Sequence, residues 1–145
     1  MKRKATVVWT GSLKEGAGTI STQSNSLTEA PYAWNTRFED EEGTNTEELL
    51  GAAHAACFTM KLSALLSGSG FPAESIETTA EVTLGKDAIT HSHLHIRASV
   101  PDIGRKQFED LAEDAKTNCM VSKALNMEIS MEAVLLDTTQ VRPMD

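Results

Sequence analysis

The two cysteines, Cys57 and Cys119, are the side chains in this sequence best suited to covalent chemistry. Only the thiolate form of cysteine is a strong nucleophile, and a free thiol has a pKa of about 8.5. Neither cysteine belongs to a Cys-x-x-Cys pair, which excludes a zinc finger and a thioredoxin-type motif. In a reducing cytosol, two such cysteines are either buried core residues or a transient, catalytic pair. Composition alone favours the buried-core interpretation.

His54 is a candidate partner for the first of these thiols. It precedes Cys57 by three residues on a stretch of helical character, so the two side chains are neighbours on one helix. A Cys–His pair can act as an activated nucleophile. No asparagine or aspartate is placed to orient the imidazole, and helix neighbours of this kind often arise by chance. We therefore favour a structural histidine over a catalytic base.

A row of alternating histidines, His91, His93 and His95, suggests metal binding, because imidazole is a common metal ligand. The opposite face of the same segment holds Leu94, Ile96, Ala98 and Val100, so it is the buried face of a strand. The histidines then lie on the outward face together with Arg97, whose positive charge would repel a metal ion. We expect an exposed row without a function and no metal site, with a metal protein as the alternative.

The longest helix of the sequence is predicted over residues 44–66, and it must position His54 and Cys57. Thr44 and Glu47 have the Ser/Thr-x-x-Glu spacing of a capping box, which satisfies free backbone amides at a helix start. Spacings of three and four define one face with the residues Leu50, Ala53, Cys57, Met60 and Ala64. Because the helix is apolar on more than one face, it must be buried on more than one side. A homodimer that sandwiches two such helices would achieve this.

The remaining elements follow from alternation and helical spacing. Strands are expected at residues 4–10, 19–23, 31–38, 75–84, 89–100 and 127–136. A second helical region is expected at residues 104–123, with an interruption at Asn118 and Cys119, and residues 137–145 form a loose tail. The order βββ–α–ββ–α–β, with the strands grouped, predicts an α+β fold with mostly antiparallel sheets around the central helix.

Length and charge limit the class of protein. A chain of 145 residues is long enough for one domain with a core, so we expect a single domain over residues 1–145. No run approaches the roughly 18 apolar residues of a membrane span, and the basic start lacks an apolar signal core. We therefore expect a cytoplasmic protein without a membrane partner. A net charge of −8, spread along the chain, argues against nucleic-acid binding.

Three separated segments resemble the signature of the OsmC/Ohr family, and most closely its OsmC-like branch. Residues 35–39 read Asn-Thr-Arg-Phe-Glu, and residues 43–58 run from Gly-Thr-Asn to Ala-Ala-His-Ala-Ala-Cys-Phe. The segment from Asn118 to Ser122, Asn-Cys-Met-Val-Ser, is similar to the family's Cys-Pro-Val-Ser. The similarity covers nearly the whole chain, including the order of the elements.

This resemblance implies a thiol-dependent peroxidase that reduces organic hydroperoxides to alcohols in oxidative and osmotic stress defence. It implies an OsmC-like fold and an intertwined homodimer with active sites at the interface. By the family's motif, Cys57 is the peroxidatic cysteine and Cys119 the resolving one. Arg37 and Glu47 match the family's arginine–glutamate pair beside the reactive thiol, with Glu48 as the adjacent alternative. The other function that we consider is a non-catalytic binding protein of the same fold, holding an apolar ligand at the dimer interface.

The implied chemistry is consistent with the residue types. Arg37 would favour the Cys57 thiolate by its charge, and Glu47 would hold Arg37 through a bidentate pair. Attack on the peroxide leaves a sulfenic acid on Cys57, and Cys119 condenses with it to a disulfide before over-oxidation proceeds. An external thiol must then reduce the disulfide, and the family suggests a dithiol of the lipoyl type. No metal, haem or flavin cofactor is needed.

Helix dimensions add one constraint to this site. Glu47 and Cys57 are ten residues apart in the sequence, which is roughly 15 Å along a straight helix. If both act at one site, either the helix breaks or the partner chain supplies the glutamate. Two antiparallel central helices related by a two-fold axis would provide the second arrangement.

Two positions depart from the family pattern, because Thr46 and Met120 stand where the family usually has proline. The first change should matter little, since Thr44 still caps the helix. The second leaves the position of Cys119 at a helix start unenforced, which affects the resolving step. The apolar surroundings of the central helix favour bulky hydroperoxides over hydrogen peroxide as substrates.

Overall fold

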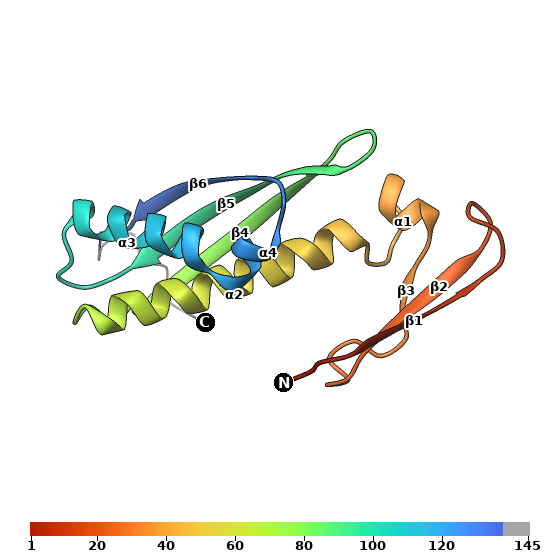
Figure 1. Cartoon of the computed structure of the whole chain (residues 1–145), viewed down its shortest axis with the longest axis horizontal. Coiled ribbons are helices and arrows are strands. Elements are labelled where there is room, and N and C mark those ends of the chain that lie inside the picture. Colours follow the sequence, from red (N-terminus) through yellow and green to blue (C-terminus); the bar gives the residue numbers. More distant parts are fainter. Residues whose placement is uncertain (138–145) are drawn as a thin grey trace. The chain divides into compact units, whose positions relative to one another are not determined.

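The computed structural model describes residues 1–137 and divides the chain into two units, Met1–Leu49 and Leu50–Asp145. Figure 1 labels the strands and helices of both. The single domain expected over residues 1–145 stays a prediction. The tail expected at residues 137–145 lies, beyond Asp137, outside the described residues.

The first unit contains a three-stranded antiparallel sheet in the order β1-β2-β3. The strands are β1 (Ala5–Thr10), β2 (Ala17–Thr22) and β3 (Ala30–Tyr32). Gly18 allows the aromatic rings on either side of β2 to meet, because a Cβ there would lie 2.7 Å from Trp9 and 2.6 Å from Tyr32. The two rings make an edge-to-face contact, with centroids 5.4 Å apart. The first two predicted strands are confirmed.

The third predicted strand, residues 31–38, is largely wrong. Only its start is extended, and the chain then forms the short helix α1 (Trp34–Phe38). The Thr36 hydroxyl lies 2.8 Å from both the backbone nitrogen and the carbonyl oxygen of Ala33, a local bond that competes with strand pairing. Trp34 and Phe38 stack at 5.2 Å, and their spacing of four residues fits a helical turn as well as an alternating strand.

The second unit packs two helices against one face of a three-stranded sheet (Figure 1). The helices are α2 (Thr46–Gly68), whose first turn belongs to the first unit, and α3 (Arg105–Asn118). The strands are β4 (Ser75–Leu84), β5 (Ile89–Ser99) and β6 (Glu128–Leu135), with β5 in the middle. β4 and β5 are antiparallel, whereas β5 and β6 are parallel and joined through α3 and the short α4 (Met120–Ala124). The predicted strands and the break in the second helical region are confirmed.

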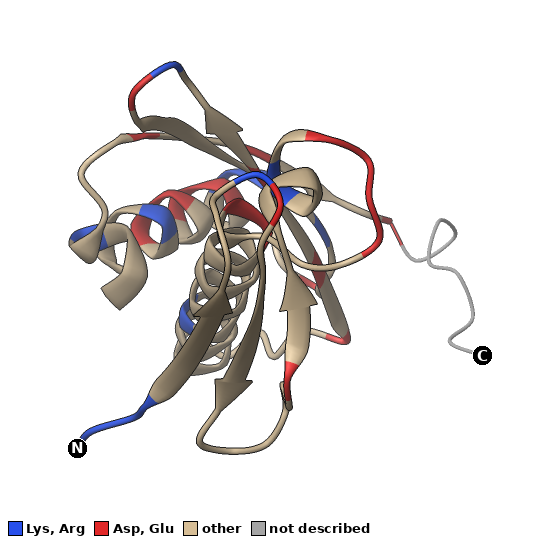
Figure 2. Cartoon of the chain, turned by 90° about the vertical axis from the view of Figure 1, so that its right-hand side faces the viewer, with Lys and Arg blue, Asp and Glu red and all other residues tan. Residues whose placement is uncertain are grey.

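Helix α3 is amphipathic. Its inner face places Phe108, Ala112 and Ala115 in the core, fully buried. Its outer surface carries acidic residues between basic residues near the two ends of the helix (Figure 2), and Lys106 pairs there with Asp110 at 2.8 Å. This distribution explains why the second helical region could be recognised from spacing alone.

Helix α2 uses a different inner face from the one predicted. Its fully buried core side chains are Phe58, Leu62 and Leu66, while Met60, assigned to the predicted face, is 76% exposed. The helix has small or apolar residues on nearly every side, so spacing alone did not distinguish the face that packs on the sheet. In a single chain, an apolar strip of this helix is therefore exposed, made of Ala52, Ala53, Ala56, Met60 and Ala64.

The start of α2 and its hydropathy also differ from expectation. Asn45 Oδ1 accepts the Glu48 N–H at 2.7 Å, so Asn45, and not Thr44, caps the helix. By length and composition α2 is apolar enough to cross a membrane, with a mean hydropathy of 1.5, contrary to the expectation that no run approaches a span. Its buried Phe58 and Leu62 pack on the sheet, while 28% of the apolar window as a whole is buried.

Candidate active site

The arginine–glutamate pair expected from the sequence is formed within the first unit. Arg37 Nε lies 2.8 Å from Glu47 Oε1, and the distance from a terminal guanidinium nitrogen to the same oxygen is 2.7 Å. Both donors thus converge on one carboxylate oxygen, which differs from the bidentate pairing that we expected. Glu47 Oε2 accepts a bond from the Thr46 hydroxyl at 3.0 Å. Arg37 is held in place from α1, and its side chain keeps 39% of its surface exposed.

The alternative partner, Glu48, is occupied elsewhere. Its carboxylate accepts the Thr44 hydroxyl at 2.9 Å. Burial alone would raise the pKa of the Glu47 carboxyl. Its pKa is nevertheless lowered, because the carboxylate accepts hydrogen bonds from Arg37, from its own backbone and from Thr46, and because Arg37 is positively charged. Glu47 is therefore the ionised partner of Arg37 at neutral pH.

An aromatic cavity of about 320 Å³ lies beside Arg37 in the same unit. It is lined by Trp9, Leu13, Tyr32, Ala33, Trp34, Arg37, Phe38, Asn45 and Thr46. The guanidinium also stands over the Phe38 ring at 5.2 Å. A cavity with apolar walls and one cation at its edge suits a ligand with a bulky apolar group and a polar or anionic end.

Both cysteines lie in the second unit as free thiols. Cys57 is half-buried on α2 and packs against the core, in which Cys119 is buried with 1% exposure. Cys119 stands between α3 and α4 and caps α4, since its Sγ accepts the Ser122 N–H at 3.3 Å. Cys119 thus stands at a helix start with Met120 in place of the family's proline, and the effect of Met120 on the resolving step stays a prediction.

His54 is fully buried and lies between two serines. Its Nδ1 is 2.7 Å from Ser92 Oγ on β5, and its Nε2 is 2.8 Å from Ser122 Oγ on α4. The Ser122 hydroxyl is also 3.0 Å from Cys119 Sγ. His54 is thus linked to Cys119 through the Ser122 hydroxyl, and it precedes Cys57 by about one turn on α2. Burial lowers the pKa of His54, so the ring is neutral at pH 7.

Sequence reasoning missed both serines of this network. The stronger signal was Ser92, a polar residue in the buried register of an otherwise apolar strand face that continues with Leu94 and Ile96. The signal at Ser122 was weaker, because Ser122 was visible only as the last residue of the segment from Asn118 that resembles the family motif. The expectation that His54 is structural stands as an interpretation, whereas its serine partners come from the structure.

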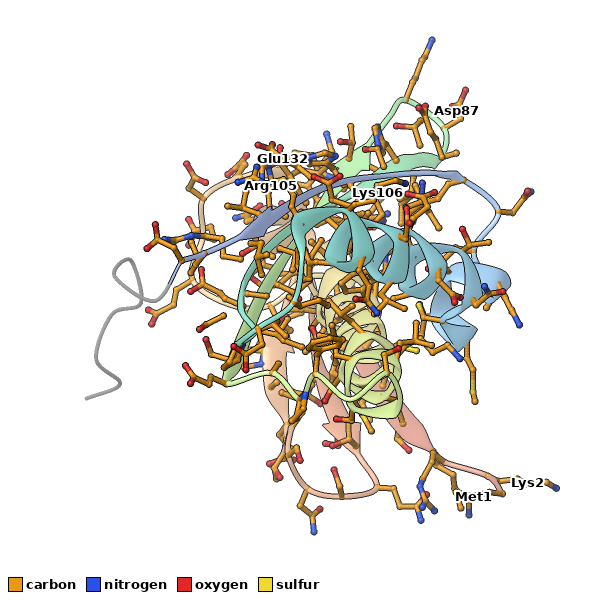
Figure 3. All side chains as sticks on the ribbon, turned by 90° about the vertical axis from the view of Figure 1, so that its left-hand side faces the viewer. Met1, Lys2, Asp87, Arg105, Lys106 and Glu132 are labelled. Atoms are coloured by element: carbon orange, nitrogen blue, oxygen red, sulfur yellow. The ribbon has the colours of Figure 1, made fainter. Side chains whose placement is uncertain are left out.

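The histidine row lies on the outer face of the second sheet. His93, His95 and the Glu132 carboxylate on β6 have potential ligand atoms within 4.8 Å of one another. Figure 3 shows Glu132 on the side of the sheet away from α3. His91 and His93 both bind the Ser130 hydroxyl. The neighbouring strand thus adds a carboxylate to the row, which the sequence alone did not show; the absence of a metal stays an expectation.

The family model described as OsmC-like protein matches residues 39–133. The chain therefore belongs to the OsmC-like protein family, and the resemblance seen in the sequence is confirmed. Peroxiredoxin OsmC of Escherichia coli (strain K12) is 47% identical over 134 residues, which cover 90% of this chain and 94% of that protein.

Solved structures show the same fold. An OsmC-like protein from Mycoplasma pneumoniae has a TM-score of 0.74 at 12% identity, with 94% of this chain and 99% of that chain covered. The organic hydroperoxide resistance protein OhrB of Bacillus subtilis has a TM-score of 0.67 at 23% identity, with 90% and 98% covered. At these identities the similarity establishes the fold alone, and it confirms the predicted OsmC-like α+β architecture.

Proposed function

We propose that this protein is a cysteine-based peroxidase that reduces organic hydroperoxides in stress defence, with Cys57 as the peroxidatic and Cys119 as the resolving cysteine. Family membership and the 47% identity to a protein named as a peroxiredoxin support a thiol peroxidase. The observation that carries the proposal is the placement of two free thiols in one core, Cys57 at its edge and Cys119 inside it.

In the first step, the Cys57 thiolate attacks the outer oxygen of the hydroperoxide. The sulfur–oxygen bond forms, the O–O bond breaks, and the leaving alkoxide takes up a proton to give an alcohol. Arg37, held by Glu47, provides positive charge for the thiolate and for the developing negative charge on the leaving oxygen. Glu47 is a positioning residue, since it acts through Arg37.

In the second step, the Cys119 sulfur attacks the Cys57 sulfenic acid, which forms the disulfide and releases water. An external dithiol then reduces the disulfide by exchange through a mixed disulfide. We propose a reductant of the lipoyl type, because two linked thiols complete the exchange within one molecule. No metal, haem or flavin enters these steps, because sulfur carries the electrons throughout.

A homodimer brings the two halves of this site together. Helix α2 is continuous from Thr46 to Gly68, so Glu47 and Cys57 of one chain are separated by roughly 15 Å along the helix. The exposed apolar strip of α2, with Met60, supports an antiparallel pairing of two such helices. The Arg37–Glu47 pair of one chain then faces Cys57 of the other. Sedimentation of Met60→Lys should show a shift towards monomer with loss of peroxidase activity, and a fully active monomer would contradict this arrangement.

The aromatic cavity beside Arg37 supports bulky hydroperoxides as substrates. Its apolar walls can bury an alkyl or aryl group while the peroxide group meets the guanidinium. Because hydrogen peroxide has nothing to place there, kcat/KM for cumene hydroperoxide should exceed that for hydrogen peroxide. Trp34→Ala should reduce this preference, and equal kcat/KM values in the unmodified protein would contradict it. We place the enzyme in the cytoplasm, where dithiol reductants are available.

A thiol titration with cumene hydroperoxide tests the residue roles. The unmodified protein should lose both thiols per chain, and Cys119→Ser should accumulate a sulfenic acid on Cys57 that a dimedone probe traps. Cys57→Ser should retain its remaining thiol, and it serves as the matched control. If the thiols survive a stoichiometric amount of peroxide, the peroxidase proposal fails. The cavity then favours the alternative, a binding protein for an apolar ligand.

A further inference from the structure

The peroxidase steps described above leave one buried titratable group without a role. His54, Ser92, Ser122 and Cys119 form a continuous hydrogen-bonded chain that joins β5, α2 and α4, with distances of 2.7, 2.8 and 3.0 Å. Stability alone does not explain such a chain, because apolar side chains of similar shape can replace buried hydrogen-bonded partners at little cost.

The direction of the hydrogen bonds follows from counting protons. A neutral imidazole has one N–H and one lone pair, so His54 donates to one serine and accepts from the other. If Nδ1–H donates to Ser92, Nε2 accepts the Ser122 hydroxyl. Ser122 oxygen is then free to accept the S–H of Cys119. In this arrangement His54 Nδ1–H, the Ser122 hydroxyl and the Cys119 S–H each have an acceptor, and a path for a proton leads from the sulfur to the ring.

We propose that Ser122 and His54 form a proton relay that serves Cys119 in disulfide formation and reduction. As the Cys119 sulfur attacks the Cys57 sulfenic acid, its proton passes to Ser122 Oγ and the Ser122 proton passes to His54 Nε2. The S–S bond forms, the S–O bond breaks, and the released hydroxide takes up one proton to leave as water, so that the ring is neutral again. During reduction the relay runs in reverse: the proton given up by the attacking external thiol passes to His54, and through Ser122 it protonates Cys119 as that sulfur leaves.

The roles within the relay differ. Ser122 touches the reacting sulfur directly, whereas His54 acts through Ser122 and is a positioning residue. Ser92 fixes the orientation and tautomer of the ring from the other side. The inference rests on the proposed function, because it requires Cys119 to be the resolving cysteine. It goes beyond that function by giving Ser122 and His54 a role in disulfide formation, in addition to the two cysteines and the Arg37–Glu47 pair.

Single-turnover kinetics can separate the two steps. Cys57 is oxidised with one equivalent of cumene hydroperoxide, and sulfenic acid formation and disulfide formation are followed separately in the unmodified protein and in Ser122→Ala, Ser122→Thr and His54→Gln. Disulfide formation should slow by at least about tenfold in Ser122→Ala and His54→Gln, the range of general acid–base catalysis, while sulfenic acid formation keeps its rate. Ser122→Thr, which retains the hydroxyl, should restore most of the lost rate. The exposed His95→Gln is the matched control.

A solvent deuterium isotope effect provides a readout that a purely structural role would not change. It should be clear for disulfide formation in the unmodified protein and reduced in His54→Gln, and thermal unfolding of each variant shows that it is folded. If Ser122→Ala and His54→Gln form the disulfide at the normal rate, the relay is wrong while the peroxidase proposal stands. If the unmodified protein forms no Cys57–Cys119 disulfide, the proposed function itself fails.

Discussion

Replacing Glu47 by glutamine tests whether the carboxylate positions Arg37 for the first step of catalysis. Glutamine keeps the size and an acceptor oxygen at the place where two guanidinium nitrogens converge, 2.7 and 2.8 Å away, but it removes the negative charge. The variant therefore isolates charge from shape. The Arg37 side chain should then sample orientations that do not serve the thiolate.

The magnitude follows from the strength and exposure of this pair. Hydrogen bonds to charged groups contribute about 1.5–3 kcal/mol, roughly twice as much as neutral ones. Glu47 is largely buried, but Arg37 is 39% exposed, so solvent screening reduces the loss to about 1–2 kcal/mol. Since about 1.4 kcal/mol corresponds to a factor of ten, the rate of Cys57 oxidation should fall roughly 5- to 30-fold.

The assay is the second-order rate constant of Cys57 oxidation by cumene hydroperoxide, measured by stopped flow on Cys119→Ser backgrounds to remove the resolving step. Glu48→Gln is the matched control, because the Glu48 carboxylate, next to Glu47 in the sequence, binds the Thr44 hydroxyl and not Arg37. The control should react at the unmodified rate. Equal losses in both variants, or no loss in Glu47→Gln, would refute the assignment of Glu47 as the positioning residue.

Three further outcomes follow from the described residues. Asn45→Ala should lower the free energy of unfolding by about 1 kcal/mol in chemical denaturation, whereas Thr44→Ala should change it less, because Asn45 caps α2. The pKa of His54 is lowered by burial, so the unfolded state binds more protons below about pH 6.5, and stability should fall as the pH drops through that range. His54→Gln should flatten this part of the stability curve; an unchanged slope would contradict it. Treatment with EDTA should leave peroxidase activity unchanged, because the histidine row lies on the outer face of the sheet, and a loss restored by zinc would overturn this.

Much of the second unit could be predicted from the sequence, because its patterns are unambiguous. The alternation over residues 75–84 fits only a half-buried strand, and the spacing of Phe108 and Ala112 fits only an amphipathic helix. The family motif then assigned Cys57 and Cys119, and the structure places both thiols in one core. Alternation also selected the correct outer face for the histidine row.

The errors lie where two structures satisfy the same pattern. Trp34 and Phe38 are two strand periods apart and also one helical turn apart, and a local bond from Thr36 decided between them. On α2, small side chains surround the whole helix, so periodicity did not reveal that Phe58 faces the sheet while Met60 faces outward. The second choice depends on tertiary contacts that no local window contains, whereas the first depends on a local hydrogen bond that the alternating pattern does not reveal.

The buried network around His54 shows why a polar site can escape sequence reasoning altogether. In the sequence, a histidine among alanines suggests only a structural role, because its hydrogen-bond partners lie far away in the chain. Here they are Ser92 on β5 and Ser122 on α4. The same geometry gives the network a direction, since only one of its ends touches a thiol. A buried imidazole that needed hydrogen bonds for stability alone could use backbone groups as well. The hydroxyl between His54 and Cys119 is therefore the feature that turns a satisfied core histidine into a candidate part of the catalytic cycle.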